Sequence, residues 1–105
     1  MDDKTLIWAH ACLNGEITSG MRMVALKVSG QHVTFRYYLD HEPTDFVRER
    51  AEIVAVNFDA GLSSALEKLE IEFVHSKERM SKLETLDTVL FCRWENDLVG
   101  TTPDF

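Results

Sequence analysis

Two neighbouring stretches of alternating apolar and polar residues, 21–28 and 32–39, constrain the fold of this chain more than any other feature. Alternation with a period of two is typical of β-strands that bury one face. Ser29-Gly30-Gln31 separates the two stretches, and a glycine allows the tight reversal that joins antiparallel strands. We therefore expect a β-hairpin with one face in the core and the other in water. The residues expected on the core face are Val24, Leu26, Val28, Val33, Phe35, Tyr37 and Leu39.

Helical periodicity appears on both sides of this hairpin. Residues 3–14 place apolar side chains on one helical face, and Gly15 then favours a helix end. A second helix is expected over 44–60, because Pro43 ends the preceding strand, Thr44 or Asp45 can cap the first amides, and Gly61 closes the segment. The β-branched run 53–58 is also compatible with extended structure. The residues that recur on one helical face are Leu6, Ala9, His10 and Leu13 in the first helix and Val47, Ala51, Val54 and Phe58 in the second.

Two further strands complete the expected sheet. Residues 69–74 alternate in the strand pattern, and 89–94 form a short apolar run, while the polar stretch 77–83 between them has room for a helical turn. The order α-β-β-α-β-β, read as two hairpins separated by a helix, predicts an α+β fold with one antiparallel four-stranded sheet and both helices packed on one face. The length of 105 residues predicts a single domain, 1–105, with a loose C-terminal tail over about 97–105.

The chain is acidic, with 18 Asp and Glu against 11 Lys and Arg and a formal net charge of −7. This charge repels phosphate backbones and anionic lipids, so direct binding to nucleic acid or to a membrane is not expected. It favours encounter with a basic partner, although acidity also serves solubility alone. The N-terminal sequence Met1-Asp2-Asp3-Lys4 is unlike an export signal, and no apolar run is long enough to span a membrane. We therefore expect a cytoplasmic protein.

The residues that usually carry chemistry form no recognisable site in the sequence. The four histidines, at positions 10, 32, 41 and 75, lack metal-ligand spacing, and no glycine-rich loop is present to hold phosphates. Cys12 and Cys92 lie in apolar surroundings, which predicts buried cysteines and neither a nucleophile nor a disulfide framework. We predict no catalytic residue, no metal and no cofactor, although 18 acids leave a carboxylate pair open.

Acidic residues concentrate between positions 40 and 59, where six acids stand against two bases and supply four of the seven net negative charges. One interpretation is a solvated helix face; the other is a surface that binds lysines or arginines of a partner. Tyr38 is expected on the exposed face of its strand, beside Arg36, and tyrosine is common among interface anchors. The predicted partner-binding residues are Tyr38, Asp40, Glu42, Asp45, Glu49, Glu52 and Asp59.

Several segments resemble small bacterial immunity proteins, the cognate inhibitors of polymorphic toxins that include those of contact-dependent growth inhibition systems. The resemblance covers about residues 6 to 95, with LNGEI at 13–17, MRMV at 21–24, FRYYLD at 35–40, an acidic helix, and FCRWE at 91–95. It implies a protein without catalytic activity that binds the C-terminal toxin domain of its partner and covers an active site or substrate surface. Such toxins are often nucleases, particularly ones that cleave transfer RNA. An acidic inhibitor could then mimic the charge of the nucleic acid.

Two other functions remain compatible with the sequence. A small-molecule-binding or regulatory module would need a pocket, for which Tyr38, Trp94 and His75 are the candidate lining residues. An enzyme would need a carboxylate or histidine as its base.

Overall fold

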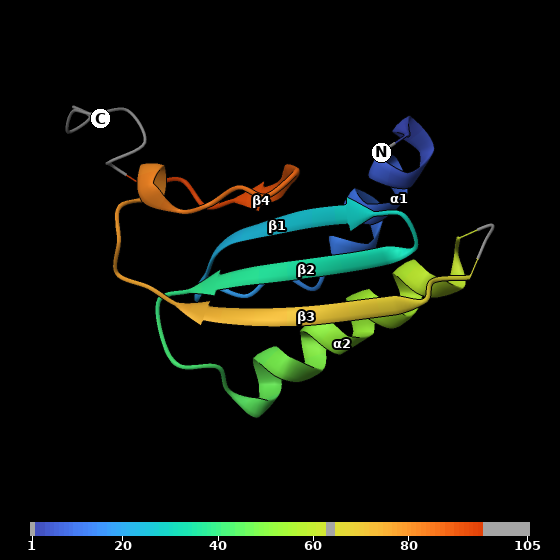
Figure 1. Ribbon diagram of the computed structural model, residues 1–105. Coiled ribbons are helices and arrows are strands. Elements are labelled where there is room, and N and C mark those ends of the chain that lie inside the picture. The colour runs from blue at the N-terminus through green and yellow to red at the C-terminus, as the bar shows by residue number, and fades with distance from the viewer. Residues whose placement is uncertain (1, 63–64, 96–105) are drawn as a thin grey trace.

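The computed structural model describes residues 2–62 and 65–95, and the expected loose tail lies outside them. The order of elements confirms the expectation of a helix, two strands, a second helix and two more strands (Figure 1). Helix α2 is continuous through 53–58, so the β-branched run there is helical. The elements are α1 (Asp3–Leu13), β1 (Met21–Ser29), β2 (His32–Leu39), α2 (Asp45–Ala60), β3 (Lys68–His75), a short 3₁₀ turn (Met80–Lys82) and β4 (Thr88–Cys92).

Strands β1 and β2 form the expected antiparallel hairpin. Val28 lies opposite Val33 and Ser29 opposite His32 across the turn. Gly30 has a φ of +61°, a conformation in which glycine carries no steric cost. The reversal therefore depends on the glycine that the sequence places between the two strands.

The sheet is mixed, and the expectation of a fully antiparallel sheet with two hairpins is wrong. Its strand order is β3-β2-β1-β4, with β3 parallel to β2 and β4 antiparallel to β1. The physical reason is α2, which runs back along the sheet after β2 and returns the chain to the end where β2 began. A strand that follows such a crossover pairs in parallel. Consequently β3 and β4 lie at opposite edges and do not pair (Figure 1).

Both helices pack on one face of the sheet, as expected. Capping fixes where they begin: the Asp2 carboxylate accepts a hydrogen bond from the Thr5 amide at 2.7 Å, and the Thr44 hydroxyl accepts one from Val47 at 3.2 Å. The Phe58 ring of α2 meets the Phe35 ring of β2 edge to face, with centroids 5.2 Å apart. The buried side chains between helices and sheet include Ala9, Leu13, Val24, Leu26, Val33, Phe35, Tyr37, Leu39, Val47, Ala51, Val54 and Phe58.

The opposite face of the sheet is partly covered, so the expectation of a wet face is wrong for the covered part. Residues 76–87 run from the end of β3 at one edge to β4 at the other, and they lay Met80 and Leu83 over this face. These two side chains pack against Met23, Ala25 and Tyr38 in a second apolar cluster. Residues 77–83 are mostly polar, so the sequence did not indicate that Met80 and Leu83 would pack on this face.

Helix α1 contacts the C-terminal end of α2 through Trp8. The indole nitrogen of Trp8 donates a hydrogen bond to the Phe58 carbonyl oxygen at 3.0 Å. Gly61 lies directly beneath the indole, where an added Cβ would stand 2.3 Å from a ring carbon. Glycine is therefore needed at position 61 because of close approach, since its φ of −91° is accessible to any residue.

Candidate protein-binding surface

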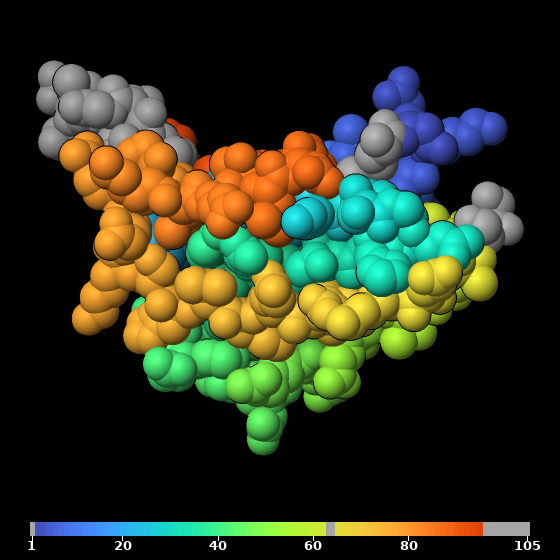
Figure 2. All heavy atoms as spheres, in the orientation of Figure 1, coloured from blue at the N-terminus to red at the C-terminus, as the bar shows by residue number. Residues whose placement is uncertain are grey.

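The outer face of α2 carries most of the acidic residues that the sequence selects. Asp45, Glu49, Glu52 and Asp59 are spaced by three, four or seven residues, which places them on one side of the helix, and all four are exposed. The opposite side of α2 faces the core. In Figure 2 the green atoms of α2 form the lower margin of the molecule, away from β1 and β4. We call these four residues the acidic stripe.

Three of the four carboxylates in the acidic stripe form no ion pair with another described residue. Only Glu49 forms an ion pair, at 3.2 Å from Arg50, and Arg50 is shared with Glu16 at the same distance. Asp45 lies in the first turn of α2, where the helix dipole favours an acid. Asp59 lies in the last turn, where a negative charge costs a few tenths of a kcal/mol to about 1 kcal/mol. The stripe thus holds concentrated, weakly compensated negative charge.

Apolar side chains lie among these acids. Val56 is 66% exposed and Phe46 59% exposed, and both belong to α2. The Arg50 guanidinium stands 5.2 Å from the centroid of the Phe46 ring, which holds that arginine over an aromatic face. Protein interfaces commonly combine an apolar centre with a charged rim. The outer face of α2 has both parts.

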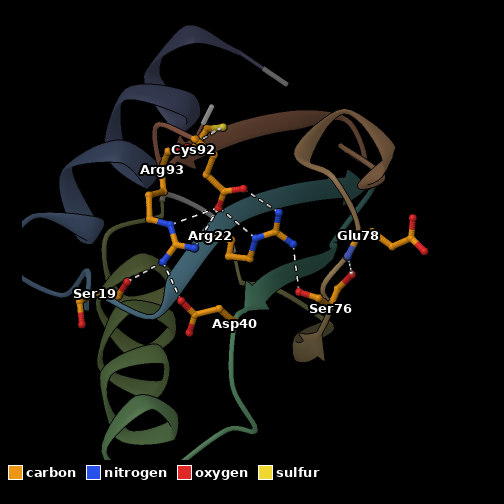
Figure 3. Close-up of polar contacts among 8 residues, drawn as sticks. Ser19, Arg22, Asp40, Ser76, Glu78, Cys92 and Arg93 are labelled. Carbon is orange, nitrogen blue, oxygen red and sulfur yellow. Dashed lines mark hydrogen bonds and ion pairs between the residues drawn. The ribbon is translucent and has the colours of Figure 1, made fainter. Parts of the chain in front are cut away.

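Asp40, one of the predicted binding residues, belongs instead to a polar network at the end of the sheet (Figure 3). Its carboxylate accepts a hydrogen bond from Arg93 Nη1 at 2.8 Å, and the same nitrogen donates to the Ser19 carbonyl oxygen at 2.8 Å. Arg93 also binds Glu95, with Nη2 2.9 Å from Oε2. The contacts with Asp40 and Glu95 raise the pKa of Arg93. Asp40 therefore connects the end of β2 to Arg93, which directly follows β4.

Arg22 anchors the other side of this network. It is only 5% exposed, and it binds Glu95 in two places, with Nε 3.0 Å from Oε2 and Nη2 2.7 Å from Oε1. Its Nη1 donates to the Ser76 carbonyl oxygen at 3.0 Å. Hydrogen bonds from Arg22, and secondarily from Arg93, hold the pKa of the Glu95 carboxyl below its usual value. The residues of this network lie far apart in the chain, so the local sequence pattern did not bring them together.

An irregularity in β1 accompanies the burial of Arg22. The register of β1 on β2 shifts between Met21 and Met23, as in a β-bulge. Met21 accordingly packs in the cluster beneath the helices, whereas Met23 packs on the opposite face with Tyr38. The position of Arg22 within the apolar run 21–26 was a signal in the sequence that could have indicated a buried ion pair.

Tyr38 is buried, so the expectation that it lies on an exposed face of its strand is wrong. It is 4% exposed, and its hydroxyl donates to the Glu84 carbonyl oxygen at 2.8 Å and accepts from Arg36 Nη1 at 3.2 Å. The strand alternation placed it correctly on the face away from the helices, but the 76–87 crossing covers that face. Tyr38 therefore cannot line an open pocket with Trp94 and His75. Glu42, another predicted binding residue, is exposed and lies 3.0 Å from His75 Nδ1.

The cysteines differ from each other. Cys12 is buried, as expected, and burial raises the pKa of its thiol. Cys92 is exposed, which corrects its expected burial; it ends a short edge strand, where fewer neighbours cover a side chain. Among residues 2–62 and 65–95, no three His, Cys, Asp or Glu side chains are grouped so as to hold a metal ion. Neither α1 nor α2 has the length and apolar character needed to cross a bilayer.

Comparison with known families identifies the family to which the chain belongs. A search among curated proteins finds no match for the chain. Residues 2–95, which include every helix and strand described above, match the family described as MafI2 immunity protein. This agrees with the resemblance to bacterial toxin immunity proteins in the sequence, and the chain belongs to the MafI2 immunity protein family.

Proposed function

We propose that this protein neutralises a cognate bacterial toxin domain that is a basic nuclease, such as one that cleaves transfer RNA or other RNA. In this proposal the protein covers the active site or the nucleic-acid-binding surface of the toxin in the cytoplasm, and it needs neither catalysis nor a cofactor. Delivery of the toxin by contact-dependent growth inhibition is one route that fits. The observation that supports the proposal most is the acidic stripe, because three of its four carboxylates have no ion pair within the described residues.

Electrostatics explains why such a surface suits a nuclease inhibitor. A nuclease holds the nucleic-acid backbone with lysines and arginines, and those cations attract a concentrated negative surface. Complementary charge can raise association rates to about 10⁸ M⁻¹s⁻¹ or more, against about 10⁵–10⁶ M⁻¹s⁻¹ without steering. Fast capture matters for an inhibitor, since one active toxin molecule can cleave many substrates before it is bound.

Of the seven residues predicted to bind the partner, the proposal keeps the four that lie on the outer face of α2. Asp45, Glu49, Glu52 and Asp59 are the residues that we propose to face the toxin. Asp40 and Glu42 lie outside α2, and each contacts a distant segment of the chain: Asp40 binds Arg93, and Glu42 lies 3.0 Å from His75 Nδ1.

Growth rescue tests the proposal. The cognate toxin domain should arrest growth when expressed alone, and co-expression of this protein should restore growth. Double reversal of Glu49→Lys with Glu52→Lys should abolish rescue. The matched control is Glu67→Lys with Glu78→Lys, which makes the same change in net charge at exposed sites outside α2 and should still rescue. Growth arrest that persists with the unmodified protein would contradict the proposal.

A further inference from the structure

We propose that a groove on α2 receives one arginine side chain from the toxin, an inference that rests on the proposed function and specifies its central contact. The groove has a volume of about 280 Å³. Its size lies below the roughly 300–1,000 Å³ of sites that enclose drug-sized ligands, which favours a single side chain as its occupant. It is lined by Glu49, Glu52, Ile53, Val56 and Asn57.

The lining supplies an apolar floor for the stem of such a side chain. Ile53 and Val56 are three residues apart, so they are neighbours on the helix surface, and Val56 is exposed on the side of α2 away from the core. Arginine and lysine bury their methylene stems against apolar surface while their charged heads reach polar groups. Contact with these two side chains would remove apolar surface from water on both molecules.

The rim of the groove supplies acceptors for the charged head. Glu52 forms no ion pair with another described residue, so its carboxylate is available for both nitrogens of a guanidinium. Glu49 already contacts Arg50 at 3.2 Å and would add a second, shared carboxylate. Arginine fits better than lysine, because its planar fork binds a carboxylate in two places and is less strongly hydrated than an ammonium group.

A second hollow on the described chain lacks this complementarity. The hollow beside the β1–β2 turn, of about 220 Å³, contains Lys68 and Glu70, which pair with each other at 2.7 Å. The Glu70 carboxylate in this hollow is therefore already paired. The α2 groove combines exposed apolar residues with a carboxylate that has no partner among the described residues.

Nuclear magnetic resonance titration of the whole protein with short peptides tests the groove without the toxin. The probes are blocked tripeptides, Gly-X-Gly, in which X is arginine, lysine or citrulline; citrulline is close to arginine in shape but uncharged. The arginine peptide should shift the amide signals of Ile53, Val56 and Asn57, and it should bind at least about tenfold more tightly than the citrulline peptide.

Two variants assign the contact. Glu52→Gln should weaken binding of the arginine peptide about tenfold, because it removes the charge while keeping the shape. The matched control is Asp59→Asn, which changes another exposed acid of α2 that also has no ion pair among the described residues and lies outside the groove. It should change affinity by less than about twofold.

The outcomes separate this inference from the proposed function. No shift at the groove, equal binding of citrulline, tighter binding of lysine, or equal effects of the two variants would each overturn the arginine assignment, even if growth rescue succeeds. If rescue fails while the arginine peptide still binds, the proposed function is refuted, and the toxin is no longer the source of the arginine.

Discussion

Replacement of Glu95 by glutamine should destabilise the protein more than replacement of Arg22 by methionine. Glu95 lies between two arginines, with Oε1 2.7 Å from Arg22 and Oε2 2.9 Å from Arg93, and its side chain is 16% exposed. Glutamine would leave both guanidinium groups without this carboxylate. Removal of one partner from a buried pair costs about 3–5 kcal/mol, and we expect about 3 kcal/mol here because Glu95 keeps some exposure.

The loss of Arg22 should cost less, because Glu95 would keep its contacts with Arg93. The Arg22→Met variant loses the hydrogen bonds to Glu95 and to the Ser76 carbonyl oxygen, but it leaves no unpaired buried charge, and methionine recovers part of the packing. We expect a total loss of about 2 kcal/mol. The difference between the two variants depends on a carboxylate shared by two arginines.

Urea unfolding at neutral pH, followed by circular dichroism, measures both losses. With a denaturant slope of about 1.5 kcal/mol/M, a loss of 3 kcal/mol lowers the midpoint by about 2 M. Glu84→Gln is the matched control, since Glu84 is 73% exposed at 3.3 Å from Arg36 and should contribute less than about 0.5 kcal/mol. An Arg22→Met variant as unstable as Glu95→Gln, or more so, would refute the reasoning.

Three further outcomes are expected. Because Arg22 and Arg93 lower the pKa of Glu95 in the folded state, the stabilisation from Glu95 is fully present above its unfolded pKa and is lost as pH falls through the lower folded pKa. Glu95→Gln should therefore flatten the acid side of the profile of stability against pH, and an unchanged profile would refute this. Tyr38→Phe removes the hydrogen bond to the Glu84 carbonyl oxygen, so it should lower the free energy of unfolding by about 1–2 kcal/mol, which scanning calorimetry measures. Toxin affinity, measured by titration calorimetry, should stay unchanged. Gly61→Ala should displace the Trp8 indole and change its fluorescence emission spectrum, measured in a Trp94→Phe background so that Trp8 alone emits. An unaltered spectrum would contradict the close approach.

The sequence predicts the elements and one face of the core because these depend on local chemistry. The cap at Thr44 and the stop at Gly61 set the limits of α2, and helical spacing identifies Val47 and Phe58 as buried. The hairpin likewise follows from alternation on both sides of Gly30. Each of these features is encoded within a few residues along the chain.

The direction of β3 and the burial of Tyr38 depend on distant segments. Alternation indicates which side chains share a face of a strand, but it does not indicate whether the next strand runs parallel or antiparallel. Tyr38 is covered by Met80 and Leu83, which arrive from a stretch that is mostly polar. The sequence also does not indicate which acids have partners within the chain. Asp40 and Asp45 look equivalent in the sequence, yet Asp40 binds Arg93, 53 positions away.

The salt dependence of toxin association tests most directly whether the acidic stripe captures a basic partner. Stopped-flow mixing with the cognate toxin domain should give a fast rate that falls steeply as salt rises. The Glu49→Lys, Glu52→Lys double variant should associate at least about tenfold more slowly, with a flatter salt dependence, while Glu67→Lys, Glu78→Lys keeps most of the original rate. Equal rates and equal salt dependence for the unmodified protein and the α2 variant would contradict capture through this surface.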